Sequence, residues 1–494
     1  MLRSGPYALI ALALSVAALV SAEETTVLKP LPSKRAVGKL PQIVPVVRGK
    51  ELYIAWQGWA QNKPGDKIFV YKISLDALEK GQLTRVREVA SLGTFVGFAV
   101  DGTGVDHVLT AKAESFANKP AGKFVDEVHK PYRKDVLAVT AKGTALDLNA
   151  AKYTDLPFYG ITNSGTGRLA ATQNHIAAVF ARRRYTPRDN LVHQEASTLL
   201  VSRDWAGVGI KAGNSVSHSF DQRLIADGND FLALHQADTY PFAGLIAERI
   251  SPLPRARSVR VNVFACPTFG NAVYFELGGV AAEKDGYPVL FTATRNTKPV
   301  NQENQAKMHA QAWDLALVYV LRGFESKGNG KNPYDTVTSG MLATGYAKDE
   351  AFTVDNFTWN PATSKYDKKE PRAIKRRVHW LTEHDEKTRA SNAKLVRLQD
   401  GQYIALWEER GTRNGARAML LTLDGKAPAK TVKAGEPIEL KDLKLPQGDD
   451  ALAITIGNKP HAAWVTGGDS DDQLLLLHTL DAELTYKAYP LSLP

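Results

Sequence analysis

The sequence predicts an all-β protein folded as a β-propeller of seven blades. Three observations support this prediction. Short runs of Val, Ile, Leu, Phe and Tyr are separated by Gly, Asn and Asp, which is the pattern of strands joined by tight turns. The same unit recurs about every 55–60 residues, a spacing typical of propeller blades. Helical periodicity is hard to find anywhere in the chain.

Each repeat contains an apolar strand, a tight turn, a second apolar strand, a variable polar loop and a third strand. Asp-Gly and Asn turns fit hairpins that need a positive φ. The continuous run Leu474–Leu477 indicates strands buried on both faces, as when one blade packs on the next. The seven repeats span residues 43–76, 95–143, 167–204, 222–250, 277–323, 393–425 and 451–481.

The spacing is irregular after the fifth repeat. The turn residues Gly286 and Gly401 lie about two repeats apart, so eight blades stay open as an alternative. Residues 324–375 are rich in Lys, Asn, Gly and Asp and are interpreted as an irregular insertion, followed by an outer strand at 376–383. An array of two-sheet β-sandwiches is the alternative fold.

The N-terminus has the pattern of a secretory signal peptide. Arg3 precedes an apolar run from Tyr7 to Val20, and small residues at the end of this run predict cleavage after Ala22. The run is too short to span a bilayer. We therefore expect a signal peptide over 1–22, an extension over 23–40 and a single propeller domain over 41–494, in a secreted or periplasmic protein with no membrane span.

The amino-acid composition limits the kinds of bond and partner that we expect. The single cysteine, Cys266, excludes an internal disulfide, and its apolar surroundings predict a core position. The formal net charge of +10 favours anionic partners such as acidic glycans, whereas export disfavours nucleic acid. We expect a monomer with no cofactor and no metal. The acidic segment 466–473 leaves calcium as a minor alternative.

The loops between the second and third strands of all blades should open on one face of a propeller. These loops are unusually polar, and arginine offers a planar fork to carboxylate, sulfate or phosphate groups. We expect a site for an anionic or polyhydroxylated ligand on this face. Its candidate residues are Arg182, Arg183, His193, His218, Asp221, His235, Asp238, Tyr240, Arg295 and Arg410.

The most unusual local stretch is 234–245, in which a strongly apolar strand ends in polar residues. His235 and Asp238 could form an acid–base pair, with the carboxylate orienting the imidazole. A structural brace between Tyr240 and Asp238 is the alternative. Together with Glu408, His235 and Asp238 are the candidate catalytic residues.

Two classes of function follow. The first is an exported propeller that binds an acidic glycan or a protein partner without covalent chemistry, similar in general character to secreted bacterial propellers. The alternative is a glycoside hydrolase at the mouth of the central channel. It would be either sialidase-like, although the Ser-x-Asp-x-Gly-x-Thr-Trp box is absent, or built on Asp238 and Glu408. The sequence leaves open whether the protein is an enzyme.

Overall fold

The structure is a computed structural model of the 494-residue chain. It describes residues 43–60, 63–91, 94–111, 137–141, 144–147, 167–186, 191–202, 210–211, 216–217, 221–239, 242–252, 257–267, 275–297, 312–324, 341–360, 363, 365–443, 445, 451–467 and 475–493.

The described strands form seven sheets, numbered here in chain order. Sheet 1 contains β1 (Ile43–Arg48), β2 (Glu51–Ala60), β3 (Lys63–Ser74) and β4 (Thr84–Ala90), with the 3-10 helix η2 (Leu75–Lys80) before β4. Sheet 2 contains β5 (Thr94–Val100), β6 (Asp106–Ala111), β7 (Leu137–Ala141) and β8 (Thr144–Asp147). Sheet 3 contains β9 (Gly167–Ala171), β10 (His175–Thr186), β11 (Leu191–Ser202), β12 (Ile210–Lys211) and β13 (Val216–Ser217). Sheet 4 contains β14 (Gln222–Asp227), β15 (Asp230–Thr239), β16 (Phe242–Ser251) and β17 (Arg257–Cys266).

The remaining three sheets follow the same order. Sheet 5 contains β18 (Phe275–Val280), β19 (Gly286–Ala293), β20 (Asp314–Leu321), β21 (Lys348–Asn360) and β22 (Lys365–Trp380). Sheet 6 contains β23 (Arg389–Gln399), β24 (Gln402–Arg410), β25 (Gly415–Asp424), β26 (Thr431–Ala434) and β27 (Ile438–Leu440). Sheet 7 contains β28 (Leu452–Ile456), β29 (Lys459–Gly467), β30 (Leu475–Leu480) and β31 (Tyr486–Leu491).

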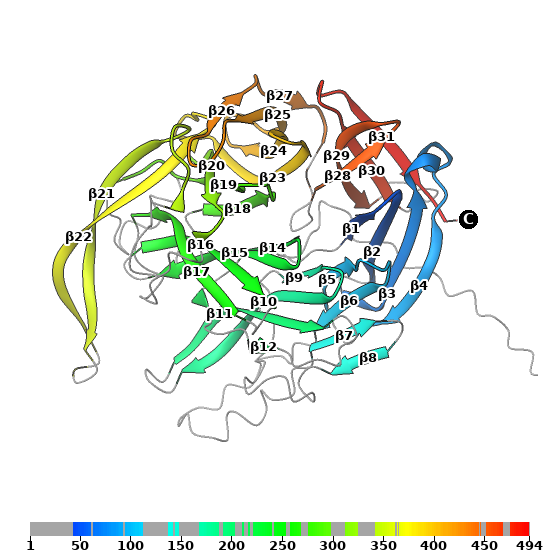
Figure 1. Cartoon of the computed structure of the whole chain (residues 1–494), viewed down its shortest axis with the longest axis horizontal. Helices are drawn as coiled ribbons and strands as arrows, with labels where there is room; N and C mark the ends of the chain where they lie inside the picture. The colour runs from blue at the N-terminus through cyan, green and yellow to red at the C-terminus, as the bar shows by residue number, and fades with distance from the viewer. Residues whose placement is uncertain are drawn as a thin grey trace, which may run out of the picture.

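The sheets are arranged around a centre, as blades of a propeller (Figure 1). All the strand pairs within the sheets are antiparallel, and the first three strands of every sheet follow one another in sequence order. In sheet 5 the order beyond β20 is β22 and then β21. The first strands of neighbouring sheets contact one another from β1 through β5, β9, β14, β18 and β23 to β28. The ring closes where β28 and β29 meet β1. The predicted all-β propeller is therefore confirmed, and the seven sheets of the described chain correspond to the seven repeats.

Close approach between first strands restricts the residues that fit there. In β18, a Cβ added to Gly279 would lie 2.4 Å from the backbone nitrogen of Leu395 on β23. In β5, a Cβ added to Gly97 would lie 2.9 Å from the backbone nitrogen of Leu169 on β9. Glycine at these positions lets adjacent sheets come together near the axis of the ring.

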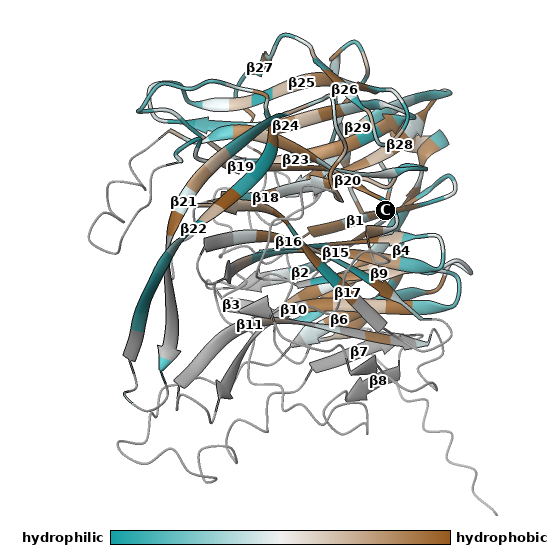
Figure 2. Ribbon diagram, turned by 60° about the vertical axis from the view of Figure 1, so that its left-hand side comes forward, coloured by the Kyte–Doolittle hydropathy of each residue, from teal (hydrophilic) through white to brown (hydrophobic). Residues whose placement is uncertain are grey.

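The core lies between the sheets, and the strands are accordingly apolar along much of their length (Figure 2). Four tryptophans, Trp56, Trp313, Trp407 and Trp464, are among the largest fully buried side chains. Cys266 is also fully buried in the cluster between sheets 4 and 5, as predicted, and burial raises the pKa of its thiol to about 12. The core is thus a set of inter-sheet layers rather than one central mass.

The seam between the last and first sheets is closed by packing. Leu475, Leu477 and Leu491 of sheet 7 belong to the same buried cluster as Leu52 and Trp56 of sheet 1. A parallel backbone bridge joins Gln82 to Ser492 beside this cluster. Among the described residues, no strand is shared between these two sheets, since every sheet is built from strands consecutive in the chain.

The segment 324–375 corrects one prediction. We expected an irregular insertion, but its described part contains β21 and most of β22, a long hairpin that bows outward from the ring (Figure 1). The predicted outer strand at 376–383 is the end of β22, which pairs with β20 at residues 379 and 380. The hairpin escaped prediction because its outer face is charged, while Phe352, Val354 and Ile374 on its inner face pack against Ala265 of sheet 4.

No helix within the described ranges is long and apolar enough to cross a membrane. The predicted signal peptide and the extension over 23–40 lie outside the described residues.

Candidate functional site at the mouth of the ring

Turns between second and third strands open on one face of the ring, here called the β2–β3 face. The first strand of each sheet begins at this same face, because neighbouring strands are antiparallel. Arg389 begins β23 and Arg410 ends β24, and the two residues lie directly opposite each other across the strand pair. Two arginines therefore meet at the β2–β3 face of sheet 6.

Each of these arginines has a carboxylate partner. Nη2 of Arg410 donates to Oε2 of Glu408 at 3.0 Å, and Nη2 of Arg389 lies 3.5 Å from Oε1 of Glu276 on β18. The Arg389 guanidinium also stands over the ring of Trp313, with 3.4 Å between Cζ and the ring centroid. The resulting cluster joins sheets 5 and 6 and contains two positive and two negative groups.

The two arginines differ in exposure. The side chain of Arg410 is 54% exposed, whereas that of Arg389 is 31% exposed. Burial lowers the pKa of Arg389, and the positive charge of Arg410 lowers it further, while Glu276 opposes the shift. The stacked Arg389 and the more exposed Arg410 together present guanidinium groups to solvent.

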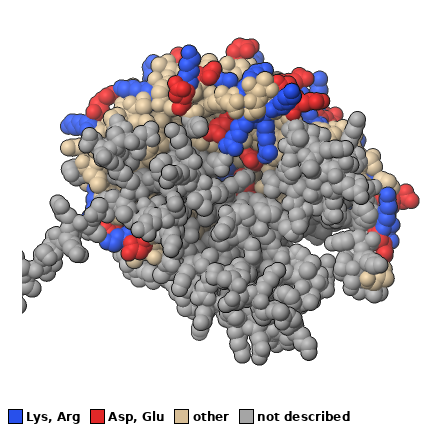
Figure 3. Space-filling view, turned by 180° about the vertical axis from the view of Figure 1, so that it is seen from behind, with Lys and Arg blue, Asp and Glu red and all other residues tan. Residues whose placement is uncertain are grey.

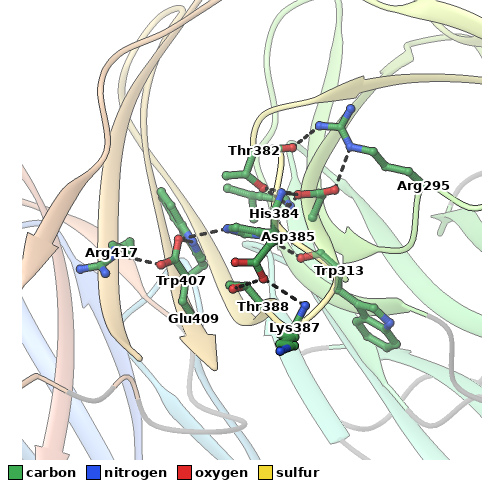
Figure 4. A network of polar contacts seen from close by, with 12 residues as sticks. Arg295, Trp313, Thr382, His384, Asp385, Lys387, Thr388, Trp407, Glu409 and Arg417 are labelled. Atoms are coloured by element: carbon green, nitrogen blue, oxygen red, sulfur yellow. Dashed lines mark hydrogen bonds and ion pairs between the residues drawn. The ribbon is translucent and has the colours of Figure 1, made fainter. Parts of the chain in front are cut away.

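A second polar network lies beside this cluster, between sheets 5 and 6 (Figure 4). Nε2 of His384 contacts Oε1 of Glu409 at 3.1 Å, and Nδ1 contacts the carbonyl oxygen of Trp313 at 2.8 Å. Nδ1 also lies 3.2 Å from a carboxylate oxygen of Asp314. Both ring nitrogens face only acceptors here, so both must donate, and the ring is an imidazolium.

The pKa shifts of His384 and Glu409 agree with this hydrogen-bond geometry. Burial alone would lower the pKa of His384, but hydrogen bonds to Asp314 and Glu409 raise it to about 9. Burial likewise opposes ionisation of Glu409, yet His384 and Arg417 hold its pKa down at about 2. His384 therefore links β20 of sheet 5 to β24 of sheet 6 through charged hydrogen bonds.

Arg295, Glu408 and Arg410 are the predicted site residues that the structure brings to one region. Nε of Arg295 donates to Asp314 at 2.8 Å, and Nη2 donates to the carbonyl of Thr382 (Figure 4). Its guanidinium lies 5.3 Å from the ring centroid of Trp380. Arg295 thus belongs to the His384 network rather than standing alone in solvent.

Asp221 and His235 are buried. Asp221 pairs with Arg223, whose guanidinium also donates to the carbonyls of Leu277 and Gly278 in the next sheet. This arrangement ties sheet 4 to sheet 5.

The described carboxylate partner of His235 is Glu248. Its side chain is fully buried, and Nε2 contacts Oε2 of Glu248 on β16 at 2.8 Å. Burial lowers its pKa, opposed by Glu248. His235 is consequently part of the interior of sheet 4, where it pairs with Glu248; the pair with Asp238 stays a prediction, because the side chain of Asp238 lies outside the described side chains.

Several predicted site residues cannot be placed. The side chains of Arg182, Arg183, His193 and Asp238 lie outside the described side chains, and His218 and Tyr240 lie outside the described residues. Most of the acidic segment 466–473 is also outside them. Within the described part of the chain, no group of three or more His, Cys, Asp or Glu residues could hold a metal ion.

Sequence reasoning missed Glu276, Asp314, His384 and Arg389 as members of this site. The segment 381–389 is short and polar and resembles an ordinary connection. The available signal was the position of this segment in the chain. It joins β22, the strand next to β20 in sheet 5, to β23, the innermost strand of sheet 6, and must therefore run inward towards the centre of the ring.

Comparison with known proteins gives little further information. No family model matches the chain, and no curated protein matches it. Among solved structures, a protein of unknown function from Dyadobacter fermentans is 11% identical with a TM-score of 0.35, covering 82% of this chain and 85% of its own. A Hadza microbial sialidase is 10% identical with a TM-score of 0.35, covering 82% and 66%. The β-propeller domain of the trilobed protease from Pyrococcus furiosus is 8% identical with a TM-score of 0.29, covering 83% and 98%. The fold assignment therefore stands on the sheet topology: the chain is an all-β protein with a β-propeller arrangement.

Proposed function

We propose that this protein is an exported propeller that binds an anionic, hydroxyl-rich ligand at the β2–β3 face, through Arg389 and Arg410. The observation that supports this most strongly is the direct opposition of the two arginines across β23 and β24. Like charges placed opposite each other destabilise a strand pair. Glu408 and Glu276 each offset one of these charges, and a ligand carboxylate or sulfate between the two guanidinium groups would reduce the repulsion further.

The groups around the two arginines favour a ligand that carries hydroxyl groups as well as an anionic group. Glu276 and Glu408 accept hydrogen bonds and would repel a simple anion of high charge, but they can accept from hydroxyl groups. Over the described residues in the upper part of Figure 3, basic and acidic side chains are interspersed. An acidic sugar offers both a carboxylate and hydroxyl donors, and so an acidic glycan fits this mixture best.

Trp313 favours a preorganised site. It is fully buried beneath Arg389 and holds the guanidinium in one plane by cation–π contact. A guanidinium that is already oriented loses less conformational freedom when it forms two parallel hydrogen bonds to a carboxylate.

Binding without covalent chemistry is preferred to glycoside hydrolysis. Of the candidate catalytic residues, His235 is fully buried within sheet 4, so it does not share a pocket with Arg295 and Glu408. The side chain of Asp238, on which the glycosidase alternative also depends, lies outside the described side chains. Arg295 and Glu408 belong to sheets 5 and 6. The imidazole therefore has no access to a ligand at the mouth of the ring.

The test is calorimetric titration with galacturonate oligomers, using neutral galactose oligomers as the matched comparison. We expect the acidic oligomer alone to bind, and Arg410→Gln to weaken it by about tenfold, the loss of one charge-assisted hydrogen bond. Arg85→Gln is the matched control, since Arg85 is also about half exposed and paired with a glutamate, but lies on the outer strand β4.

Equal binding of acidic and neutral oligomers would refute the proposal. So would equal losses in the two arginine variants. If neither oligomer binds, the protein-partner alternative becomes the better explanation of this face.

A further inference from the structure

A pocket of about 690 Å³ lies on the opposite face of the ring, where turns join first to second strands and third to fourth strands. It is formed by the turn after β18, the turn after β23 and the turn after β25, so it too lies between sheets 5 and 6. Its volume is within the range of about 300–1,000 Å³ typical of small-molecule sites. Nothing in the site at the β2–β3 face involves these residues.

The floor of the pocket is a buried polar cluster. Glu283 is 8% exposed and accepts hydrogen bonds from the hydroxyl of Tyr319 at 2.6 Å and from the hydroxyl of Tyr403. Nζ of Lys430, which is 5% exposed, lies 3.3 Å from the same carboxylate and 4.7 Å from the ring centroid of Tyr319. Four side chains from two sheets thus converge on one point.

Asp285 completes the floor and is its most accessible charged group. Its side chain is 28% exposed and lies 3.0 Å from Nζ of Lys430. The backbone nitrogen of Ala427 donates to it at 2.9 Å. Burial opposes ionisation of Asp285, but hydrogen bonds from Tyr319, Ala427 and Lys430 lower its pKa, so the carboxylate is charged near neutral pH.

The floor carries a net negative charge. Burial and the neighbouring carboxylates raise the pKa of Tyr319 and of Tyr403, so both phenols stay neutral. Two carboxylates, Glu283 and Asp285, then face one ammonium, that of Lys430. The rim contributes two lysines, Lys284 and Lys426, and two aspartates; of these aspartates, Asp400 pairs with Arg397, and Asp424 lies 3.9 Å from Nζ of Lys433. The excess negative charge is therefore confined to the floor.

The residues of the walls are mostly polar. They include Gln399, Gln402 and Thr422, together with the turn residues Gly401 and Gly425. Such a lining suits a ligand with many hydroxyl groups and little apolar surface.

We propose that this pocket binds a small molecule that carries one primary ammonium group on a hydroxyl-rich frame, of which an amino sugar is the simplest example. The ammonium would lie beside Asp285 and balance the excess negative charge of the floor. The hydroxyl groups would face the amides and the hydroxyl of the walls. The inference is independent of the proposed function of the β2–β3 face.

The test compares three sugars of one size: glucosamine, glucose and glucuronate, titrated calorimetrically at about pH 6.5, where the amine is protonated. We expect glucosamine to bind at least tenfold more tightly than glucose, and glucuronate to bind least. Asp285→Asn should reduce glucosamine affinity at least tenfold. Asp76→Asn, an exposed aspartate paired with a lysine on sheet 1, is the matched control and should change nothing.

A steric variant protects the test from loss of folding. Thr422→Trp fills the pocket from its wall and leaves the floor residues in place, so it should abolish glucosamine binding with an unchanged melting temperature. Arg410→Gln, on the other face, should bind glucosamine normally. The proposal is overturned if glucose binds as tightly as glucosamine, if glucuronate binds best, if no sugar binds, or if Thr422→Trp binds glucosamine as the wild type does.

Discussion

The ion pairs of His384 with Asp314 and Glu409 make the free energy of unfolding of this protein depend on pH. The side chains of His384, Asp314 and Glu409 are each 3–4% exposed, so solvent screens their interactions little. The pKa of His384 rises from 6.5 in the unfolded chain to about 9 in the folded protein. That difference corresponds to about 3 kcal/mol of folding free energy at 1.36 kcal/mol per pKa unit.

The direction follows from the raised pKa. Below about pH 6.5 both the folded and the unfolded chain hold the proton, and the full contribution is present. Between about pH 6.5 and 9 the unfolded chain releases the proton first, and the free energy of unfolding falls by roughly 1.4 kcal/mol per pH unit from this group. Above about pH 9 the contribution is lost.

The measurement is urea-induced unfolding of the wild type and of His384→Gln at about pH 6 and pH 9.5. We expect the variant to be less stable at the lower pH, where it leaves the buried Asp314 and Glu409 without their cation. We expect the difference between the two proteins to shrink by about 3 kcal/mol at the higher pH. A difference that is the same at both values would refute the reasoning, because it would mean that His384 does not carry a proton in the folded state.

Two further predictions concern packing. Gly279→Val should destabilise the protein by about 1–3 kcal/mol in urea unfolding, because its side chain would collide with the backbone of Leu395; unchanged stability would mean that the first strands can separate. Cys266 should not react with a thiol reagent in the native protein and should react fully in urea, because its thiol is buried and its pKa raised to about 12; rapid native labelling would contradict the core position.

The local pattern of the blades was predictable because it depends on short-range geometry. The seven turn residues expected between first and second strands are Gly49, Gly102, Asn174, Gly228, Gly286, Gly401 and Asn458. Four of them, Gly49, Gly228, Gly401 and Asn458, have positive φ values of 59–71°, whereas the other three do not. Each is flanked by apolar strands that pair antiparallel around the turn. Strand and turn signals of this kind require no knowledge of distant residues.

The long hairpin and the site depend on distant contacts and were predicted less well. β22 is charged on its exposed side, and only the alternation of Phe352 and Val354 on β21 and the apolar Ile374 indicated a buried face. Arg410 was identified as a site residue, but its partner Arg389 is 21 positions earlier, and its position opposite Arg410 depends on the strand register. His235 was correctly noticed as unusual, yet burial against Glu248 rather than exposure explains it.

The seam between sheets 7 and 1 has a consequence for how the chain folds. The ion pair between Lys487 and Glu79 beside the seam joins residues 408 positions apart, and the apolar cluster there spans a similar separation. Contacts this distant in sequence form slowly, because the intervening chain must first be ordered. During synthesis the N-terminal sheet emerges first and must wait with the face around Leu52 and Trp56 uncovered until the last sheet arrives. The ring is therefore most vulnerable to aggregation before its final blade is made, and this face is where a chaperone would be needed.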